Sequence, residues 1–374
     1  MKINLLLMIP SLKTGGSERQ LVYLLNNLDK NTFSPNLILL TNENSFVEEV
    51  KDSVNIVRVK NYKNIIGSFW QIKKIIEDKK IDIVHTILPT ANFFGGMIKL
   101  FMGKKISLIT SQRGEHFSYF NKWTICDLFS HRVADFVVVN SKAIKNNCVD
   151  FLKIERGKIG IVYNGVPEVN NNHYSPPKET LKKYFLKDGI PIILSVGRFD
   201  ELKGHQVLVK IISKILEKRE IYLFIAGDGP LKKNVEAFVK SKGLENFIKF
   251  PGNVKAIEPL YRMSDIFVLH TFSEGFSNAV SEAMAYSLPV ITTDIPANRE
   301  LIENDIDGIL VDINDHNTFS KKIINLLEDK QKRILIGKNA RRKISKRFSI
   351  DKMVRKYEKI YDIIFKKQTV VSIE

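Results

Sequence analysis

Short apolar runs alternate with amphipathic stretches along nearly the whole chain. The apolar runs predict buried strands, and the amphipathic stretches between them predict helices. Strands are predicted at or near residues 3–9, 36–41, 55–59, 81–85, 106–110, 135–139, 159–162, 191–197, 221–226, 247–250, 265–270, 289–292 and 308–311. Strands that alternate with helices predict an α/β protein with doubly wound parallel sheets.

The chain has two halves that open in the same way. Each begins with a strand, then a short turn, then an amphipathic helical pattern: ERQLVYLLNNL in the first half and HQVLVKIISKIL in the second. A polar segment with three prolines, residues 167–177, separates them and is typical of a linker. We therefore predict a Rossmann-like domain over residues 1–166, a linker over 167–184 and a second Rossmann-like domain over 185–349.

Two glutamates, Glu274 and Glu282, bracket the stretch EGFSNAVSE, which follows the predicted strand 265–270 and enters a helical pattern. Glu274 is expected in the loop after the strand, and Ser277 or Asn278 is expected to cap the helix. Backbone N–H groups at such a helix start bind anions at the carboxyl edge of a parallel sheet. Together with two carboxylates they suit a ligand that carries both phosphate and hydroxyls, such as a nucleotide sugar. The alternative is a solvated helix with unrelated acids.

Arg198 and Lys203 follow the first strand of the second half, so both can reach the same edge of the sheet. Departure of a leaving group from a nucleotide sugar places charge on a diphosphate, and cations already in position stabilise that charge. Arginine offers a planar fork to two phosphate oxygens, and lysine a compact point charge. In a chain with 58 Lys and Arg residues, any single one is by default a surface charge.

Gly15 and Gly16 follow the first strand and allow the backbone to approach a ligand phosphate closely. An ordinary strand–helix turn is the alternative. The sequence Gly227-Asp228-Gly229 fails the dinucleotide fingerprint, because Lys232 stands where the third glycine is required. That loop is equally compatible with a purely structural turn.

Composition agrees with a globular protein of two domains. The chain has 374 residues, of which 44% are hydrophobic, and no run reaches the roughly 20 apolar residues of a membrane-spanning helix. The first residues predict a strand rather than a signal peptide, since the apolar part is short and runs into a glycine turn. Cys126 and Cys148 are too few for a disulfide framework and fit a reducing cytoplasm. The net charge of +17 suits nucleic acid, an anionic membrane or phosphorylated substrates.

Six motifs in order resemble those of the family-4 retaining glycosyltransferases, which have the GT-B fold. Besides EGFSNAVSE they are Gly15-Gly16-Ser17-Glu18-Arg19, Val162-Tyr163-Asn164-Gly165-Val166, Val196-Gly197-Arg198-Phe199 with Lys203-Gly204, Ala226-Gly227-Asp228-Gly229-Pro230, and Phe250-Pro251-Gly252-Asn253-Val254. The resemblance implies two Rossmann-like domains facing a cleft, the first binding the acceptor and the second the nucleotide sugar. It also implies that the last helix, residues 350–367, crosses back onto the first domain.

The resemblance further implies roles for residues. Glu274 would bind hydroxyls of the donor sugar and Glu282 those of the ribose, while Arg198, Lys203 and the helix start would hold the leaving phosphate. The residues expected to bind the donor are Gly15, Gly16, Arg198, Lys203, Asn253, Val254, Glu274, Gly275, Phe276, Ser277, Asn278 and Glu282. No enzymic nucleophile, metal or cofactor is implied.

In the first domain the chain departs from many members of the family. Arg113 stands where relatives carry a histidine close to the reacting sugar carbon, and His116 lies three residues further on. Either could face the sugar. His85 is a weaker candidate, because a histidine at the end of a strand is more often a hydrogen-bonded wall.

A metal site is not predicted. Asp305-Ile306-Asp307 spells the D-x-D of metal-dependent glycosyltransferases, but it lies in an Asn/Gly loop away from the proposed site. The seven histidines show no ligand spacing.

The resemblance therefore implies a retaining, metal-independent hexosyl- or N-acetylhexosaminyltransferase. Its acceptor would be a hydroxyl of a glycan or of a lipid-linked glycan in surface polysaccharide synthesis. The alternatives are a GT-B epimerase or phosphorylase, or a non-catalytic nucleotide-sugar binder. A nucleic-acid binder is disfavoured, because a compact basic–aromatic motif is missing.

The chain is predicted to act in the cytoplasm, on the inner face of the membrane. Its segment 92–105 mixes large apolar residues with Lys99, Lys104 and Lys105, and the preceding stretch adds Lys73, Lys74, Lys79 and Lys80. A basic and apolar surface of this kind binds anionic lipid. The alternative is a core helix with solvated lysines at its end.

Overall fold

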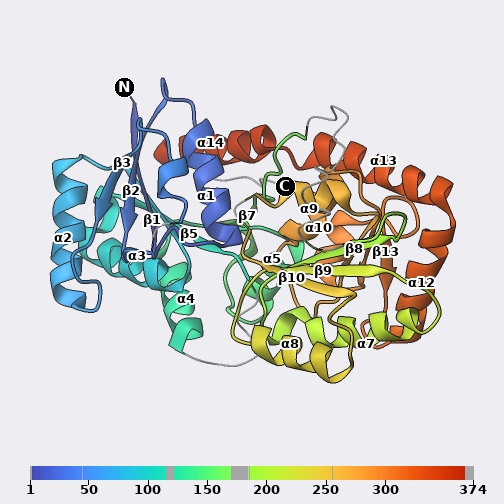
Figure 1. The fold of residues 1–374 in the computed structure, drawn as a ribbon. Helices are drawn as coiled ribbons and strands as arrows, with labels where there is room; N and C mark the ends of the chain where they lie inside the picture. The colour runs from blue at the N-terminus through green and yellow to red at the C-terminus, as the bar shows by residue number, and fades with distance from the viewer. Residues whose placement is uncertain are drawn as a thin grey trace. The chain divides into compact units, whose positions relative to one another are not determined.

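A computed structural model gives the structure of the chain (Figure 1). It describes residues 2–43, 45–114, 122–169, 184, 186–254 and 256–366. The chain forms two compact units. Unit 1 comprises Met1–Gly165 and Ile350–Glu374, and unit 2 comprises Val166–Ser349. Most of the predicted linker at 167–184 lies outside the described residues.

Unit 1 is built on a seven-stranded parallel sheet with the order β3-β2-β1-β4-β5-β6-β7. Its strands are β1 Ile3–Ile9, β2 Phe33–Leu39, β3 Asn55–Arg58, β4 Ile83–Ile87, β5 Ser107–Gln112, β6 Phe136–Val139 and β7 Ile159–Ile161. Every strand predicted in this half is present, with boundaries shifted by up to three residues. The order reverses between β1 and β4, which is where ligands bind in sheets of this kind.

Helices cover both faces of this sheet (Figure 1). They are α1 Gly16–Asn27, α2 Ile65–Asp78, α3 Pro89–Met102, α4 Lys122–Val133, α5 Lys142–Asp150 and α14 Ile350–Phe365, with short 3-10 helices at η1 Val47–Glu49, η2 Gly103–Lys105 and η3 Arg156–Lys158. Side chains of a strand alternate between faces. Leu5 and Leu7 of β1 accordingly pack with α1 and α14, while Leu6 and Met8 pack with α2 and α3. The last helix is thus part of the unit 1 core.

Unit 2 contains a six-stranded parallel sheet with the order β10-β9-β8-β11-β12-β13. Its strands are β8 Ile192–Val196, β9 Tyr222–Ala226, β10 Ile248–Gly252, β11 Ile266–Leu269, β12 Val290–Thr293 and β13 Ile309–Val311. Its helices are η4 Glu201–Lys203, α7 His205–Leu216, α8 Lys232–Ser241, α9 Glu258–Met263, α10 Asn278–Ala285, α11 Pro296–Leu301, α12 His316–Glu328 and α13 Lys330–Arg347. The order reverses between β8 and β11. The predicted fold of two Rossmann-like units is confirmed.

One side of α3 belongs to the core. A Cβ at Gly95 would lie 2.6 Å from Thr86 of β4, and one at Gly96 would lie 2.7 Å from Phe129 of α4. The two glycines therefore let the helix approach its neighbours closely. Lys99 forms an ion pair of 2.7 Å with Asp135, so its charge is neutralised. The expectation that Lys99 contributes a free cation for lipid is wrong.

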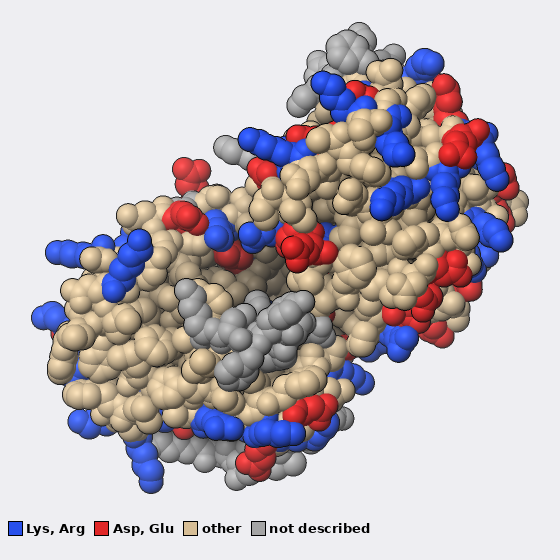
Figure 2. Space-filling model, turned by 90° about the horizontal axis from the view of Figure 1, so that it is seen from below, with Lys and Arg blue, Asp and Glu red and all other residues tan. Residues whose placement is uncertain are grey.

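In the face shown in Figure 2, basic side chains are scattered and acidic ones are interspersed among them. Within the described part of the chain, no helix is both long enough and apolar enough to cross a membrane.

Candidate functional site

Arg198, Lys203 and Glu274 lie at the carboxyl edge of the unit 2 sheet, where the strand order reverses. The first two follow β8 and the third follows β11. Lys203 ends the short helix η4, in which Asp200 Oδ1 accepts a bond of 3.1 Å from the Leu202 N–H. The next residue, Gly204, has a φ of 49°, and a Cβ there would lie 2.4 Å from His270 Nδ1. A glycine is therefore needed for the chain to pass between η4 and α7.

Lys203 and Glu274 form an ion pair through Nζ and Oε1. Their side chains are only 19% and 10% exposed, so the pair is largely withdrawn from water. The sequence predicts both residues at this edge but gives no sign that they bind one another. The charge of Lys203 is thus partly balanced before any ligand arrives.

Arg198 is the more available cation of the two. Its side chain is 67% exposed, and Asp200 Oδ2 lies 3.9 Å from its Nε, at the limit of an ion pair. Its carbonyl accepts a bond of 3.2 Å from His205 Nε2. Burial lowers the pKa of His205 to about 4, which keeps the ring neutral. The neutral ring therefore holds the backbone of Arg198 while its side chain stays free to reach an anion.

Ser277 occupies the N-cap position of α10, but its side chain does not cap the helix. Its Oγ is buried and finds no hydrogen-bond partner among the described residues. Phe276 packs on Phe348, with ring centroids 5.7 Å apart. The predicted position of the helix start is right, whereas the predicted capping bond from Ser277 is absent. A buried hydroxyl without a partner remains at this helix start.

Glu282 lies on the first turns of α10 and contacts the preceding helix α9. Its Oε2 accepts a bond of 3.0 Å from the hydroxyl of Tyr261. Burial, together with the charge of Glu282, raises the pKa of Tyr261 well above its usual value, so the phenol stays protonated. The ring of Tyr261 stacks on Tyr286 with centroids 5.0 Å apart. The carboxylate of Glu282 is therefore held in a fixed position.

The glycine loop after β9 is explained by backbone packing. Gly227 and Gly229 have φ values of 138° and 156°. A Cβ at Gly227 would lie 2.0 Å from the Gly197 carbonyl, and one at Gly229 would lie 2.5 Å from that of Phe199. The loop thus supports the segment that carries Arg198.

The predicted base-binding residues follow β10. This strand ends at Gly252, whose carbonyl accepts a bond of 3.0 Å from Gly227 N–H. Asn253 is exposed and Val254 half-buried just beyond it. They therefore lie next to the glycine loop in unit 2.

In unit 1 the predicted phosphate position at Gly15 and Gly16 is next to a carboxylate. Gly15 precedes α1 in an extended conformation. The buried side chain of Glu18 folds back over it, so that a Cβ on Gly15 would lie 2.2 Å from Glu18 Oε2. A phosphate bound at this helix start would have to displace that carboxylate.

Arg113 follows β5 and is held by neutral groups. Its guanidinium donates to Asn164 Oδ1 at 3.1 Å and to the hydroxyl of Tyr357 on α14. Its carbonyl accepts a bond of 3.1 Å from Asn140 Nδ2. Its Nε is buried and has no partner within the described part of the chain. His116, the other candidate in this loop, lies outside the described residues.

His85 is buried rather than exposed to a ligand. Its Nδ1 lies 2.7 Å from the hydroxyl of Tyr361, and its Nε2 lies 2.8 Å from Ser111 Oγ. Burial, with the nearby charge of Arg113, lowers its pKa to about 3. His85 is therefore a neutral support beneath the Arg113 loop. Sequence reasoning missed Tyr357 and Tyr361, although their i, i+4 spacing on the last helix was a signal that they share one face.

Comparison with known proteins identifies the family of the chain. Residues 14–168 match the model of Glycosyltransferase Family 4, and residues 177–343 match that of Glycosyl transferases group 1. The chain belongs to the family-4 glycosyltransferases. This confirms the identification made from the motifs.

Relatives in sequence include glycosyltransferases from bacteria. The N-acetylgalactosamine-N,N'-diacetylbacillosaminyl-diphospho-undecaprenol 4-alpha-N-acetylgalactosaminyltransferase of Campylobacter jejuni is 29% identical over 339 residues, which cover 86% of this chain and 89% of the relative. The UDP-Gal:alpha-D-GlcNAc-diphosphoundecaprenol alpha-1,3-galactosyltransferase of Escherichia coli is 26% identical, covering 82% of this chain and 81% of the relative.

Solved structures agree on the fold. A glycosyltransferase from Rickettsia africae has a TM-score of 0.84 and 26% identity, covering 98% of this chain and 100% of that structure. Anabaena HepE in complex with UDP and glucose also has a TM-score of 0.84, at 17% identity. The match covers 96% of this chain and 99% of that structure. The glycosyltransferase prediction is confirmed, and the epimerase alternative gains no support.

Both aspartates of the D-x-D sequence form ion pairs with lysines of unit 2. Asp307 is buried, pairs with Lys343 at 2.7 Å and accepts a bond of 2.7 Å from Glu303 N–H. Asp305 pairs with Lys322 at 3.3 Å. The described residues contain no group of three or more His, Cys, Asp or Glu side chains that could hold a metal ion.

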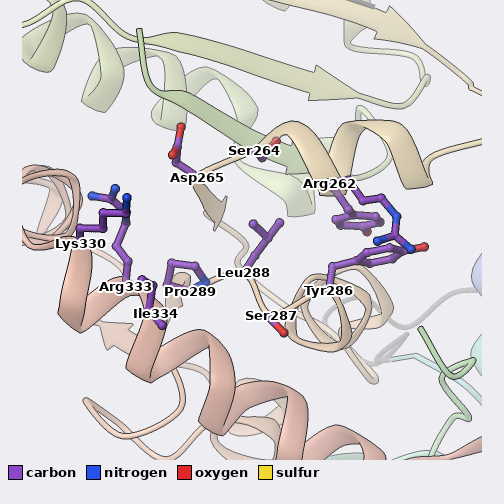
Figure 3. Close-up of a pocket in the computed structure, with 11 residues that line it drawn as sticks. Arg262, Ser264, Asp265, Tyr286, Ser287, Leu288, Pro289, Lys330, Arg333 and Ile334 are labelled. Carbon is purple, nitrogen blue, oxygen red and sulfur yellow. The ribbon is translucent and has the colours of Figure 1, made fainter. Parts of the chain in front are cut away.

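A cavity of about 330 Å³ lies in unit 2, near the amino ends of β11 and β12 (Figure 3). Lys330 and Arg333 project from α13 on one side, and Arg262 lies beside Tyr286 on the other. Arg262 pairs with Glu258, and Arg333 donates to carbonyls of α12. The cavity is at the opposite edge from Arg198 and Lys203, so it is not the predicted donor site.

Proposed function

We propose that this glycosyltransferase transfers a hexosyl or N-acetylhexosaminyl group from a nucleotide diphosphate sugar to a hydroxyl of a lipid-linked glycan. The observation that carries the proposal is the joint placement of Arg198, Lys203 and Glu274 at the β8/β11 switch point. The relatives named above act, by their names, on diphospho-undecaprenol-linked glycans, and one uses UDP-Gal. These names support the acceptor class and a uridine nucleotide.

We further propose that the reaction retains the anomeric configuration. The bond between the anomeric carbon and the phosphate oxygen breaks, and its electron pair stays on the diphosphate. The acceptor hydroxyl forms the new bond on the same face, and its proton passes to the leaving phosphate oxygen. Arg198, Lys203 and the N–H groups at the start of α10 stabilise the charge that develops. The partnerless Ser277 hydroxyl is suited to donate to the same phosphate.

No metal or cofactor is needed in this scheme. Two side-chain cations and a helix start supply the positive field that a divalent ion supplies in metal-dependent transferases. The two aspartates of the D-x-D sequence are already paired with lysines in unit 2, which supports their exclusion from the chemistry.

In the proposed site, Lys203 and Glu274 bind one another as well as the donor. Glu274 uses Oε1 for Lys203 and keeps its other oxygen to accept from sugar hydroxyls. Lys203 is oriented by Glu274, so that its remaining two N–H groups can reach the diphosphate. Binding of sugar and binding of phosphate are therefore coupled through one ion pair.

The site of action we propose is the cytoplasmic face of the membrane, where a lipid-linked acceptor is reached by a peripheral enzyme. Cys126 and Cys148 form no disulfide with one another, as fits that compartment.

The proposal is tested by screening nucleotide sugars for the shift in melting temperature that they cause. A ligand at a hundred times its dissociation constant adds about 2.7 kcal/mol to the free energy of unfolding. The donor so identified is then incubated with and without a diphospholipid-linked acceptor. We expect nucleotide diphosphate to be released only when the acceptor is present. The product should keep the anomeric configuration of the donor sugar, and EDTA should not lower the rate. Turnover of donor without acceptor would instead indicate an epimerase or hydrolase.

A further inference from the structure

Two helices of unit 1 expose a cluster of large apolar side chains. Ile65, Ile66 and Trp70 belong to α2, and Leu100 and Phe101 belong to the end of α3; their exposed fractions lie between 46% and 72%. The rings of Trp70 and Phe101 meet edge to face, with centroids 5.7 Å apart. These five residues are called the α2–α3 surface.

This surface is separate from the core that the same helices form. Phe69 and Ile72 of α2 and Phe94 and Ile98 of α3 point inward and are buried with β1. The outward side chains are thus additional to those that hold the helices in place. Contiguous exposed apolar side chains on a folded protein mark a binding surface, and tryptophan is favoured where an apolar phase meets water.

Lysines flank, in sequence, the two helices that carry the α2–α3 surface. Lys60 and Lys63 precede α2, and Lys104 and Lys105 follow α3; all four are exposed and form no ion pair with the described residues. Lys73 lies 5.8 Å from the ring centroids of both Trp70 and Phe101, but it is paired with Glu77. Free positive charge is therefore carried by residues directly before α2 and directly after α3, and these four are called the rim lysines.

We infer that the α2–α3 surface docks on an anionic lipid bilayer, inserting Ile66, Trp70 and Leu100 while the four rim lysines bind lipid headgroups. The purpose of this docking rests on the proposed lipid-linked acceptor. A second copy of the chain fits less well, because a twofold contact would place the same unpaired lysines against one another. Exposed apolar side chains on helices that are flanked by unpaired cations match a negatively charged bilayer instead.

The first experiment measures sedimentation of the full chain with vesicles. Vesicles of phosphatidylcholine with about 30% phosphatidylglycerol should retain the protein at low salt, and retention should fall steeply as salt rises. Vesicles of phosphatidylcholine alone should retain little. In a Trp123→Phe variant, Trp70 becomes the sole tryptophan, and its emission should shift to the blue on binding. No retention at low salt, or no shift, would overturn the inference.

Two variants test the location of the surface. Each rim cation near the membrane contributes roughly fivefold to affinity, so a variant with Lys63, Lys104 and Lys105 changed to Glu should bind more than about a hundredfold more weakly. The variant Ile66→Glu with Leu100→Glu should lose the blue shift. Because basic residues are scattered over the face shown in Figure 2, a control of equal net charge is needed. Lys218, Lys233 and Lys240 of unit 2 are exposed, and changing all three to Glu provides it.

The control variant should keep most of the binding. Equal loss in the control would show that attraction is diffuse and would overturn the inference. Loss of a dimer, rather than of vesicle binding, in the Ile66→Glu, Leu100→Glu variant would show that a second copy occupies the surface. Thermal shifts by the donor should be unchanged in all of these variants. Failed docking with normal donor binding contradicts this inference alone, whereas transfer activity that is missing with every donor contradicts the proposed function.

Discussion

At the scale of single residues, the ion pair between Lys203 and Glu274 changes how the donor site is understood. A lysine that binds a phosphate is ordinarily exposed in the absence of the ligand, yet Lys203 is largely buried against the Glu274 carboxylate. Arg198 is exposed and close to free. The two predicted cations therefore differ in what their removal does to the fold.

Replacing Arg198 by Ala should lower turnover by about ten- to a hundredfold, because a charge-assisted bond to the diphosphate contributes roughly 1.5–3 kcal/mol. The free energy of unfolding should be unchanged, since the side chain is exposed. Steady-state rates and urea unfolding provide the measurement. Normal turnover in this variant would remove Arg198 from the leaving-group site.

Replacing Lys203 by Ala should lower both turnover and stability, because it leaves the Glu274 carboxylate buried without its partner. The loss of stability should be about 1–3 kcal/mol. Adding Glu274→Gln to Lys203→Ala should restore most of that stability but none of the turnover. If the double variant is no more stable than Lys203→Ala, the buried ion pair does not have the energetic role assigned to it.

Replacement of the two glutamates should affect the binding of different ligands. Glu282→Gln should weaken the donor and free nucleotide diphosphate alike if this side chain holds the ribose. Its amide oxygen can still accept from Tyr261, so the fold should persist. Glu274→Gln should weaken the donor more than it weakens free nucleotide diphosphate, because the diphosphate loses only the orientation of Lys203, whereas the donor also loses its contact to the sugar. Calorimetric titration of both ligands decides, and equal effects in both variants would contradict this division.

At the scale of secondary-structure elements, α14 does more than complete the core of unit 1. Its Tyr357 and Tyr361 hydroxyls reach Arg113 and His85 respectively. A helix from the far end of the sequence thus fixes a loop after β5. We therefore regard Tyr357 as a positioning residue for Arg113.

Tyr357→Phe removes the bond to Arg113 and should lower kcat several-fold with little change in the donor KM. Tyr361→Phe is the matched control, since it makes the same chemical change one turn away and affects His85 instead. Both should lose about 1 kcal/mol of stability, measured by urea unfolding. A fall in kcat of equal size in both variants would indicate that general loosening of α14, rather than the position of Arg113, is responsible.

The sequence predicts the elements well because their signals are local. Each predicted strand is present, since a run such as 265–270 is apolar whichever neighbours it meets. The partners of side chains are not local. Nothing in the motif around Glu274 indicates Lys203, which is 71 residues away, and nothing near Arg113 indicates Tyr357 on the last helix. The error at Lys99 has the same origin, because its partner Asp135 lies outside the segment 92–105.

At the scale of the whole molecule, each unit buries titratable groups whose protonation is linked to folding. Burial lowers the pKa values of His85 and His131 to about 3 and that of His205 to about 4. Burial also raises the pKa of Asp127 to about 7. These groups are neutral in the folded protein near pH 6, and their titration on unfolding sets how stability depends on pH.

Stability should therefore fall as the pH is lowered from about 6.5 toward 4. In this range the unfolded chain protonates the three histidines, whose ordinary pKa is near 6.5, whereas the folded chain does not. A state that binds more protons is favoured by acid, so the free energy of unfolding decreases. Asp127 has the opposite effect on the free energy of unfolding, because between about pH 4 and 7 its carboxyl is protonated only in the folded chain. Its effect is smaller than that of the three histidines together.

The measurement is the urea midpoint across this pH range. His131→Gln should flatten the profile, because it removes one of the three protons taken up on unfolding. A profile that is independent of pH, or stability that rises on acidification, would show that these histidines are not buried as neutral rings.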